Sequence, residues 1–403
     1  MKRFIALLIV LCLAFAIFTG CNVSRDEALN ETQTEDAAII EDAATETETG
    51  TEEAADIVLQ TIDYEALYAT HQPDEVIGTA GGDDVTWDEY FYWIYYYGTY
   101  IENYMQQMAT YYGTEIKWDD MADEQGTYAA LPVENANEMA AQLHGAEKFY
   151  ADNKIELTAE DEEELQTAYE EEIVSSCGEG ATEEDFEALL ASEYYPKALY
   201  EKINRINKLS QRGFEDRYGE NGEKVSDEDA LNYLEENNYL AAGHILLMTI
   251  DSSTREALTD AEIAQKKATA EELAAELKAI TDPEELKTRF AELKEEYCED
   301  TGKETYPDGY LFAEGTMVTE FEDAVKALND YEVSDPVLSS YGYHIIMRLP
   351  LDPDATVTGS THNARYLFAA NEYNEGLQAS MDECGFVPAE GFSVNLSDYI
   401  KEA

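Results

Sequence analysis

Basic residues are scarce in this sequence. The chain of 403 residues has 25 Lys and Arg against 88 Asp and Glu, which gives a formal net charge of −63. A nucleic-acid-binding surface needs a basic patch, and adsorption to anionic lipid needs a basic segment, so this balance excludes both kinds of binding. The charge keeps the protein soluble and separated from its neighbours but carries no information about its fold.

Cysteine is scarce as well, with five in the chain. Cys12 and Cys21 lie in the N-terminal segment, and Cys177, Cys298 and Cys384 stand at scattered spacings. Such spacings exclude a disulfide framework and a cysteine metal cluster, and we interpret the last three as ordinary thiols. Residues 57–238 also lack a P-loop, a Gly-x-Ser-x-Gly elbow and a His-Glu-x-x-His zinc motif. We expect the protein to bind no metal and no cofactor.

Long apolar runs are confined to the N-terminus. Lys2 and Arg3 precede an apolar stretch over 4–18, the order of a signal peptide. The Thr19-Gly20-Cys21 that follows resembles a bacterial lipobox. The resemblance implies a leader over 1–20, a lipid on Cys21, and a place at the extracytoplasmic face of a bacterial membrane. An uncleaved membrane anchor with an incidental cysteine is the alternative.

The segment 21–56 is rich in Glu, Thr, Ala and Asp and has no aromatic residue. It cannot bury enough apolar surface to offset the entropy of ordering, so we expect a disordered acidic tether. Folded structure is predicted from residue 57.

Tyrosine, in contrast, is abundant, with 29 in the chain. Residues 57–238 predict a mostly helical domain that opens with a hairpin around Gly81-Gly82. Thr86 and Glu89 then predict a capping box that starts a tyrosine-rich helix to about Tyr112. Aromatic residues run all round this helix, which leaves two interpretations open: a wall that holds unfolded chain, or a helix buried on several sides. Further helices are expected over 133–153, 158–175, 182–190, 194–218 and 226–237.

Residues 239–350 predict a small separate domain. Apolar strands at 241–250 and 343–347 each contain one of the five histidines, His244 and His344. Two helices, a short strand at 310–312 and a third helix from Thr319 lie between them, with N-caps expected at Thr259 and Asp282. The order β-α-α-β-α-β has too few strands for a doubly wound fold and implies one small sheet covered by helices. The fold class is therefore α+β. A polar linker over 352–359 follows, and a helical segment over 360–403 is expected to pack back on the helical domain.

Four motifs occur in order within 240–350. They are Gly243-His244-Ile245-Leu246, Asp308-Gly309-Tyr310-Leu311-Phe312, Gly315-Thr316-Met317-Val318-Thr319-Glu320-Phe321-Glu322 and Tyr341-Gly342-Tyr343-His344-Ile345-Ile346. Together they resemble the parvulin family of peptidyl-prolyl cis/trans isomerases. The flanking helical domain, the lipobox and the C-terminal return also resemble the PrsA-like secretion foldases, whose helical part is chaperone-like.

The resemblance assigns roles to residues at the matching positions. His244 and His344 correspond to a hydrogen-bonded pair under the floor of the site, and Asp300 to a position where other members have cysteine or an acid. These three are the expected catalytic residues. The expected substrate-binding residues are Met317, Phe321, Phe312, Tyr341 and Ser339. Gly309 replaces a bulky pocket residue of the family, and Tyr306-Pro307 replaces a Gly-Gly turn.

Each residue also has a purely structural interpretation: a lone histidine on an apolar strand and Met317 and Phe321 at helical spacing are common in ordinary cores. The family order favours an isomerase and foldase acting on unfolded secreted polypeptides with X–Pro bonds. The rival is a holdase with a degenerate isomerase site. A solute-binding lipoprotein would need a two-lobed α/β pattern that the sequence lacks. Arg255 is the only cation in the loop 251–258, which argues against phosphate specificity. A homodimer is left open.

Overall fold

The computed structural model describes residues 59–123 and 126–402. Of these, 59–216 with 372–402 form one compact unit and 217–371 form a second. The expected leader, Cys21 and the acidic tether lie outside the described residues. None of the described helices is long and apolar enough to cross a membrane.

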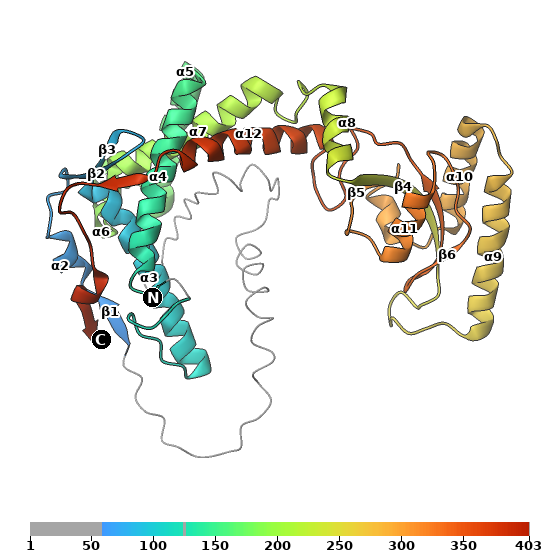
Figure 1. Cartoon of the computed structure of the whole chain (residues 1–403), viewed down its shortest axis with the longest axis horizontal. Coiled ribbons are helices and arrows are strands. Elements are labelled where there is room, and N and C mark those ends of the chain that lie inside the picture. The colour runs from blue at the N-terminus through green and yellow to red at the C-terminus, as the bar shows by residue number, and fades with distance from the viewer. Residues whose placement is uncertain (1–58, 124–125, 403) are drawn as a thin grey trace, which may run out of the picture. The chain divides into compact units, whose positions relative to one another are not determined.

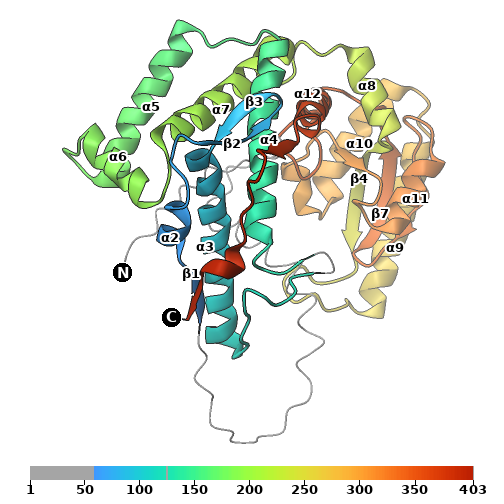
Figure 2. The ribbon, with the colours of Figure 1, turned by 60° about the vertical axis from the view of Figure 1, so that its left-hand side comes forward.

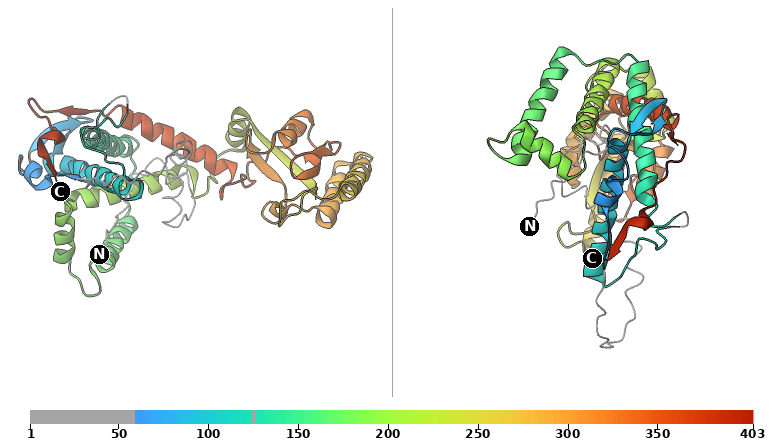
Figure 3. Two further views of the ribbon diagram at one scale, coloured as in Figure 1. Left: turned by 90° about the horizontal axis from the view of Figure 1, so that it is seen from below. Right: turned by 90° about the vertical axis from the view of Figure 1, so that its left-hand side faces the viewer.

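The first unit is mostly helical, as the sequence predicts. The tyrosine-rich helix α3 packs along α4, and the two are side by side in Figures 2 and 3. The helices are α2 (Tyr64–Tyr68), α3 (Trp87–Tyr112), α4 (Leu131–Asp152), α5 (Ala159–Cys177), α6 (Glu183–Ser192) and α7 (Lys197–Tyr218), the last of which continues to the edge of the second unit.

Helix α3 starts without the predicted capping box. Thr86 accepts no side-chain cap bond, and its hydroxyl donates to Asp88 at 2.6 Å instead. Glu89 does not bond back to the helix start, because its buried carboxylate accepts a hydrogen bond from Lys202 at 3.1 Å and pairs with His144 at 3.0 Å. Long-range ion pairing therefore overrides the local capping pattern.

Strands of the first unit join segments that are far apart in the sequence. The hairpin predicted around Gly81-Gly82 is confirmed, and a third strand from the C-terminal segment extends it in the order β3-β2-β8. A second sheet pairs β1 with β9, and Figure 2 shows the C-terminus beside β1. The strands are β1 (Gln60–Ile62), β2 (Val76–Ala80), β3 (Asp83–Thr86), β8 (Phe386–Pro388) and β9 (Ile400–Glu402).

The C-terminal segment contacts the first unit through a helix as well as these strands. In α12 (Ala364–Asp382), the Tyr373 ring meets Phe149 of α4 edge-on at 5.5 Å, and Ser380 donates to the Gly145 carbonyl at 2.9 Å. Within the expected helical segment 360–403 the helix is confirmed as α12, but beyond Asp382 the chain forms strands, because it pairs with strand edges that the folded unit provides.

The second unit contains one four-stranded antiparallel sheet in the order β5-β4-β7-β6. Helices α9 and α10 cover one face, and α11 covers the other; Figure 1 shows α9 and α10 next to each other. The α+β fold class is confirmed. The elements are α8 (Asp227–Glu236), β4 (Tyr239–Met248), α9 (Asp260–Lys278), α10 (Pro283–Tyr297), the 3-10 helix η2 (Thr301–Glu304), β5 (Tyr310–Ala313), α11 (Thr319–Ala327), β6 (Val337–Leu338) and β7 (Gly342–Arg348).

Local signals at the helix starts of this unit are confirmed. Thr259 and Glu262 form a capping box at α9, and Asp282 caps α10 ahead of Pro283. Helix α8 packs on the sheet, with Leu234 in one apolar cluster with Ala241. The second unit therefore begins earlier in the chain than the expected boundary at residue 238.

Candidate functional site

Two histidines meet on the α11 face of the sheet. His244 lies on β4 and His344 on β7, and the antiparallel register places them diagonally on adjacent strands, with His344 opposite Leu246. Their Nδ1 atoms are 3.0 Å apart and their rings stack at 5.2 Å. Both side chains are buried, with exposures of 7% and 4%.

Hydrogen bonds extend the pair at both ends. His244 Nε2 lies 2.7 Å from Asp300 Oδ2, and that oxygen also accepts a hydrogen bond from the Tyr310 hydroxyl, with the two oxygens 2.6 Å apart. At the other end His344 Nε2 lies 2.7 Å from Ser339 Oγ, which accepts from the Tyr341 backbone N–H at 3.1 Å. The six residues form one continuous chain across the floor of the site.

One proton arrangement satisfies every link with both rings neutral. A carboxylate only accepts, so His244 carries its proton on Nε2 and its Nδ1 accepts from His344 Nδ1–H. His344 Nε2 is then an acceptor, and the Ser339 hydroxyl donates a hydrogen bond to it. These tautomers are assigned from the partners. All hydrogen bonds from Tyr341 to Asp300 therefore point in the same direction.

Charge in this chain is concentrated on Asp300. The hydrogen bond from His244 holds the pKa of the Asp300 carboxyl well below its usual range, although burial acts in the opposite sense. Burial, followed by the neighbouring His244, lowers the pKa of His344 to about 3. Burial and the bond to Asp300 raise the pKa of the Tyr310 hydroxyl. At neutral pH the site thus contains a carboxylate at one end and an uncharged His344 at the other.

An apolar wall stands against the histidines. The Phe321 ring of α11 meets His244 edge-on at 5.3 Å and His344 at 5.6 Å. Met317 is half-buried and packs on the same cluster. The buried Glu322 carboxylate fixes the loop before the helix, since one oxygen accepts both the Gly315 and Met317 N–H groups at 2.9 Å.

The structure brings all eight expected site residues into this cluster, but at different depths. Phe312 is fully buried and packs behind Phe321 at 5.9 Å, so it supports the wall and is not positioned to touch a substrate. Asp300 and Met317 are half-buried, and Tyr341 is 36% exposed with the Arg255 guanidinium 5.6 Å from its ring centroid. Met317, Asp300 and Tyr341 thus form the accessible edge, and the histidines lie behind them.

Two contributors were missed from the sequence. Tyr310 and Glu322 both occur inside the quoted motifs, Asp308–Phe312 and Gly315–Glu322, but their roles depend on contacts that a motif does not show. Across residues 59–123 and 126–402 no group of three or more His, Cys, Asp and Glu could hold a metal ion.

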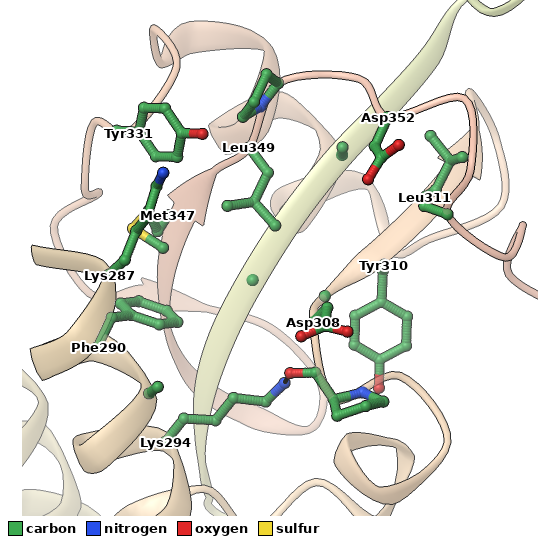
Figure 4. Close-up of a pocket in the computed structure, with 17 residues that line it drawn as sticks. Lys287, Phe290, Lys294, Asp308, Tyr310, Leu311, Tyr331, Met347, Leu349 and Asp352 are labelled. Atoms are coloured by element: carbon green, nitrogen blue, oxygen red, sulfur yellow. Dashed lines mark hydrogen bonds between the residues drawn. The ribbon is translucent and has the colours of Figure 1, made fainter. Parts of the chain in front are cut away.

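A separate cavity of about 420 Å³ lies on the α10 side of β4. In Figure 4, Lys287, Phe290 and Lys294 line it from α10, with Asp308 and Asp352 across the strand. None of the eight expected site residues lines it.

Gly309 lines this second cavity and not the histidine cluster. Its φ is +117°, and a Cβ there would lie 2.6 Å from Leu349 Cδ1 and 3.0 Å from the Ala242 carbonyl oxygen. Backbone geometry therefore requires glycine at this position. The missing side chain does not open the wall made by Met317 and Phe321.

Comparisons with known proteins match this part of the chain. A family model described as a PPIC-type PPIase (rotamase) domain matches residues 244–349. A protein named foldase protein PrsA from Oceanobacillus iheyensis is 31% identical over 190 residues, 46% of this chain and 54% of that relative. Foldase protein PrsA 1 of Bacillus cereus is 55% identical over 58 residues, 14% of this chain and 20% of its own.

The match therefore spans about half of the first of these relatives. Among solved structures, PrsA from Bacillus subtilis aligns with 77% of this chain and 92% of its own, at 21% identity and a TM-score of 0.24.

Proposed function

We propose that residues 244–349 act as a parvulin-type peptidyl-prolyl isomerase domain. On this premise the chain is a foldase that isomerises X–Pro bonds in unfolded secreted polypeptides. The single observation that carries this proposal is the directed hydrogen-bond chain from Tyr341 to Asp300 beneath the Met317 and Phe321 wall. The names of the relatives, foldases of the PrsA type, support the wider function.

The chemistry needs no cofactor. Rotation about an X–Pro bond faces a barrier of about 18–20 kcal/mol because amide resonance is lost midway, and no bond is broken. An isomerase has to hold the proline ring and bind the twisted amide better than the planar one. Met317 would hold the ring at the accessible edge, and Phe321 would close the pocket behind it.

The role proposed for the polar residues is to set the local field. Asp300 is a fixed negative charge next to Met317 and Phe321, and the hydrogen bond from His244 keeps its orientation. A preorganised charge of this kind favours one charge distribution of the amide over the other without rearrangement during rotation. We therefore assign field stabilisation to Asp300, His244 and His344, and neither nucleophilic attack nor proton transfer.

The test is exchange NMR of a short X–Pro peptide with the full chain. We expect faster cis/trans exchange with the wild-type protein and a loss of rate with Met317→Ala. Met248→Ala is the matched control, since Met248 is a partly buried methionine that packs against the α9 and α10 cluster. Phe321→Ala is a poor probe, because Phe321 is 3% exposed and its truncation would cost about 3–5 kcal/mol of stability. No acceleration by the wild-type protein refutes the isomerase.

A holdase without isomerase activity is the second candidate. The tyrosines exposed on α3, Tyr100 at 70% and Tyr111 at 78%, favour it. If Met317→Ala still suppresses aggregation of client proteins and still supports their secretion at the wild-type level, the holdase is favoured over the isomerase.

The proposal extends to the location of the protein. The segment 1–20 would be a lipoprotein leader, Cys21 would carry a lipid, and the acidic segment 21–56 would tether the folded units outside the cell membrane. The order of basic, apolar and small residues before Cys21 supports this. Labelling with a radioactive fatty acid tests it, since Cys21→Ser should abolish incorporation.

A further inference from the structure

Helix α3 begins buried and ends exposed. Trp87, Phe91 and Ile94 at its start are fully buried, whereas Tyr100, Tyr104 and Tyr111 near its end are 70%, 40% and 78% exposed. A helix advances about 100° per residue, so these three tyrosines fall within about 40° of one another. They form a single line along the helix, which we call the tyrosine stripe. It belongs to the long helix α3 of Figures 1 and 2.

A second element widens the stripe. The loop after α3 returns alongside the helix, and its Tyr128 ring stacks on Tyr104 with centroids 6.2 Å apart. Met121 in the same loop is 62% exposed. The surface is thus a row of several exposed tyrosine side chains, and not one isolated ring.

The surroundings of the stripe are acidic. Between Arg25 and Lys148 the sequence has a single basic residue, Lys117. Its ammonium is already paired with Glu115 at 3.5 Å. The loop that carries Tyr128 also has exposed acids at Asp119, Asp120 and Asp123. No lysine or arginine of α3 itself competes for the tyrosine rings.

The charge decides between the possible occupants. A second copy of the chain would bring another formal charge of −63 to an acidic surface, and like charges repel. A cation, in contrast, is attracted both by the carboxylates and by the face of a tyrosine ring. From Tyr100 to Tyr111 the stripe is about 16 Å long at 1.5 Å per residue, the length of about five residues of extended chain.

We propose that the tyrosine stripe binds an extended, lysine- and arginine-containing segment of an unfolded client polypeptide. The basic side chains lie over the rings, and their charged ends reach the neighbouring carboxylates. This inference rests on the proposed foldase function, because it names the chemistry of the client segment that the helical unit holds. It needs no proline in that segment.

The experiment uses fluorescence anisotropy of labelled peptides with the full chain. The probes are an unstructured Gly/Ser peptide with interspersed lysines and arginines, and the same peptide with the basic residues replaced by glutamates or by serines. We expect binding of the basic probe alone, weakened by added salt. The double variant Tyr100→Leu with Tyr111→Leu keeps apolar area but removes two rings and should weaken binding about 5- to 30-fold.

Two control variants make this result specific. Tyr100→Phe with Tyr111→Phe keeps both ring faces and should bind like the wild type. Tyr297→Leu removes a tyrosine that lies beside Glu296 on α10, in the second unit and not in the stripe. It should leave binding of the basic peptide unchanged. Circular dichroism checks that each variant is folded.

Equal binding of the acidic and basic probes, or unchanged binding of the basic probe by the double leucine variant, overturns the inference. The inference is also overturned if sedimentation shows the wild type to be a dimer and the leucine variant a monomer. The stripe would then be a contact between two copies of the chain. X–Pro exchange in a short peptide is measured for the same variants. X–Pro exchange by the wild type together with equal binding of the acidic and basic probes would leave the isomerase proposal standing and reject only the stripe.

Discussion

The neutral, buried His344 predicts that the second unit loses stability in mild acid. Burial lowers the pKa of His344 to about 3 in the folded protein, from 6.5 in the unfolded chain. Between these values the unfolded chain binds a proton that the folded chain does not, so stability falls as pH falls from about 6.5 toward 3. At 1.36 kcal/mol per pKa unit, the loss is about 1.4 kcal/mol at pH 5.5 and about 2.7 kcal/mol at pH 4.5.

Measurement requires a probe in the second unit, because the three tryptophans, Trp87, Trp93 and Trp118, all lie in the first. Hydrogen exchange at the amides paired between β4 and β7 reports unfolding of the correct unit within the full chain. The informative quantity is the difference in unfolding free energy between wild type and His344→Gln at each pH. The many surface carboxylates contribute equally to both proteins and cancel in that difference.

We expect the advantage of the wild type over His344→Gln to shrink by about 2.7 kcal/mol between pH 7.5 and pH 4.5. His71→Gln, a histidine of the first unit, is the matched control and should leave the exchange of β4 unchanged. A difference between wild type and His344→Gln that stays constant over this pH range would refute the reasoning, since His344 would then not be held neutral.

Three further predictions concern single side chains. Tyr310→Phe removes one hydrogen bond to the Asp300 carboxylate and should destabilise the second unit by about 1.5–3 kcal/mol, measured by hydrogen exchange; no change would mean that the bond contributes nothing. Glu322→Gln weakens the hydrogen bonds from the Gly315 and Met317 amides, so we expect a higher KM for an X–Pro peptide with little change in kcat. An unchanged KM would contradict the positioning role of Glu322. Gly309→Ala should cost about 1–3 kcal/mol of stability because of its positive φ and its close contacts, yet leave X–Pro exchange per folded molecule unchanged; a loss of that exchange would place Gly309 in the site.

Local signals in the sequence were sufficient where the partners are close in the chain. The caps at Thr259 and Asp282 depend on residues two or three positions away, and both are confirmed. The capping box at Thr86 has the same pattern but fails, because the carboxylate of Glu89 is taken by His144 and Lys202 from two other helices. Competition of this kind cannot be seen within a four-residue window.

Strand pairing between segments far apart in the sequence limits what can be predicted in the same way. Strands β8 and β9 are three residues each and have no strand pattern of their own, and they form because β2 and β1 offer free edges. For the candidate site, the family resemblance led to the histidines and Asp300. It could not supply the proton direction, the buried position of Phe312 or the role of Tyr310, which follow from distances and exposures in the folded unit.

The pairing of β1 with β9 has a consequence for biosynthesis. The second unit is one continuous stretch of chain, 217–371, whereas the first is completed only when Ile400–Glu402 reach Gln60–Ile62. During synthesis from the N-terminus, the second unit can therefore finish folding while the first still lacks strands β8 and β9. Closing so long a loop is slow relative to local folding. The topology therefore sets an order of folding: the inserted second unit can fold before the strand pairing that completes the first unit.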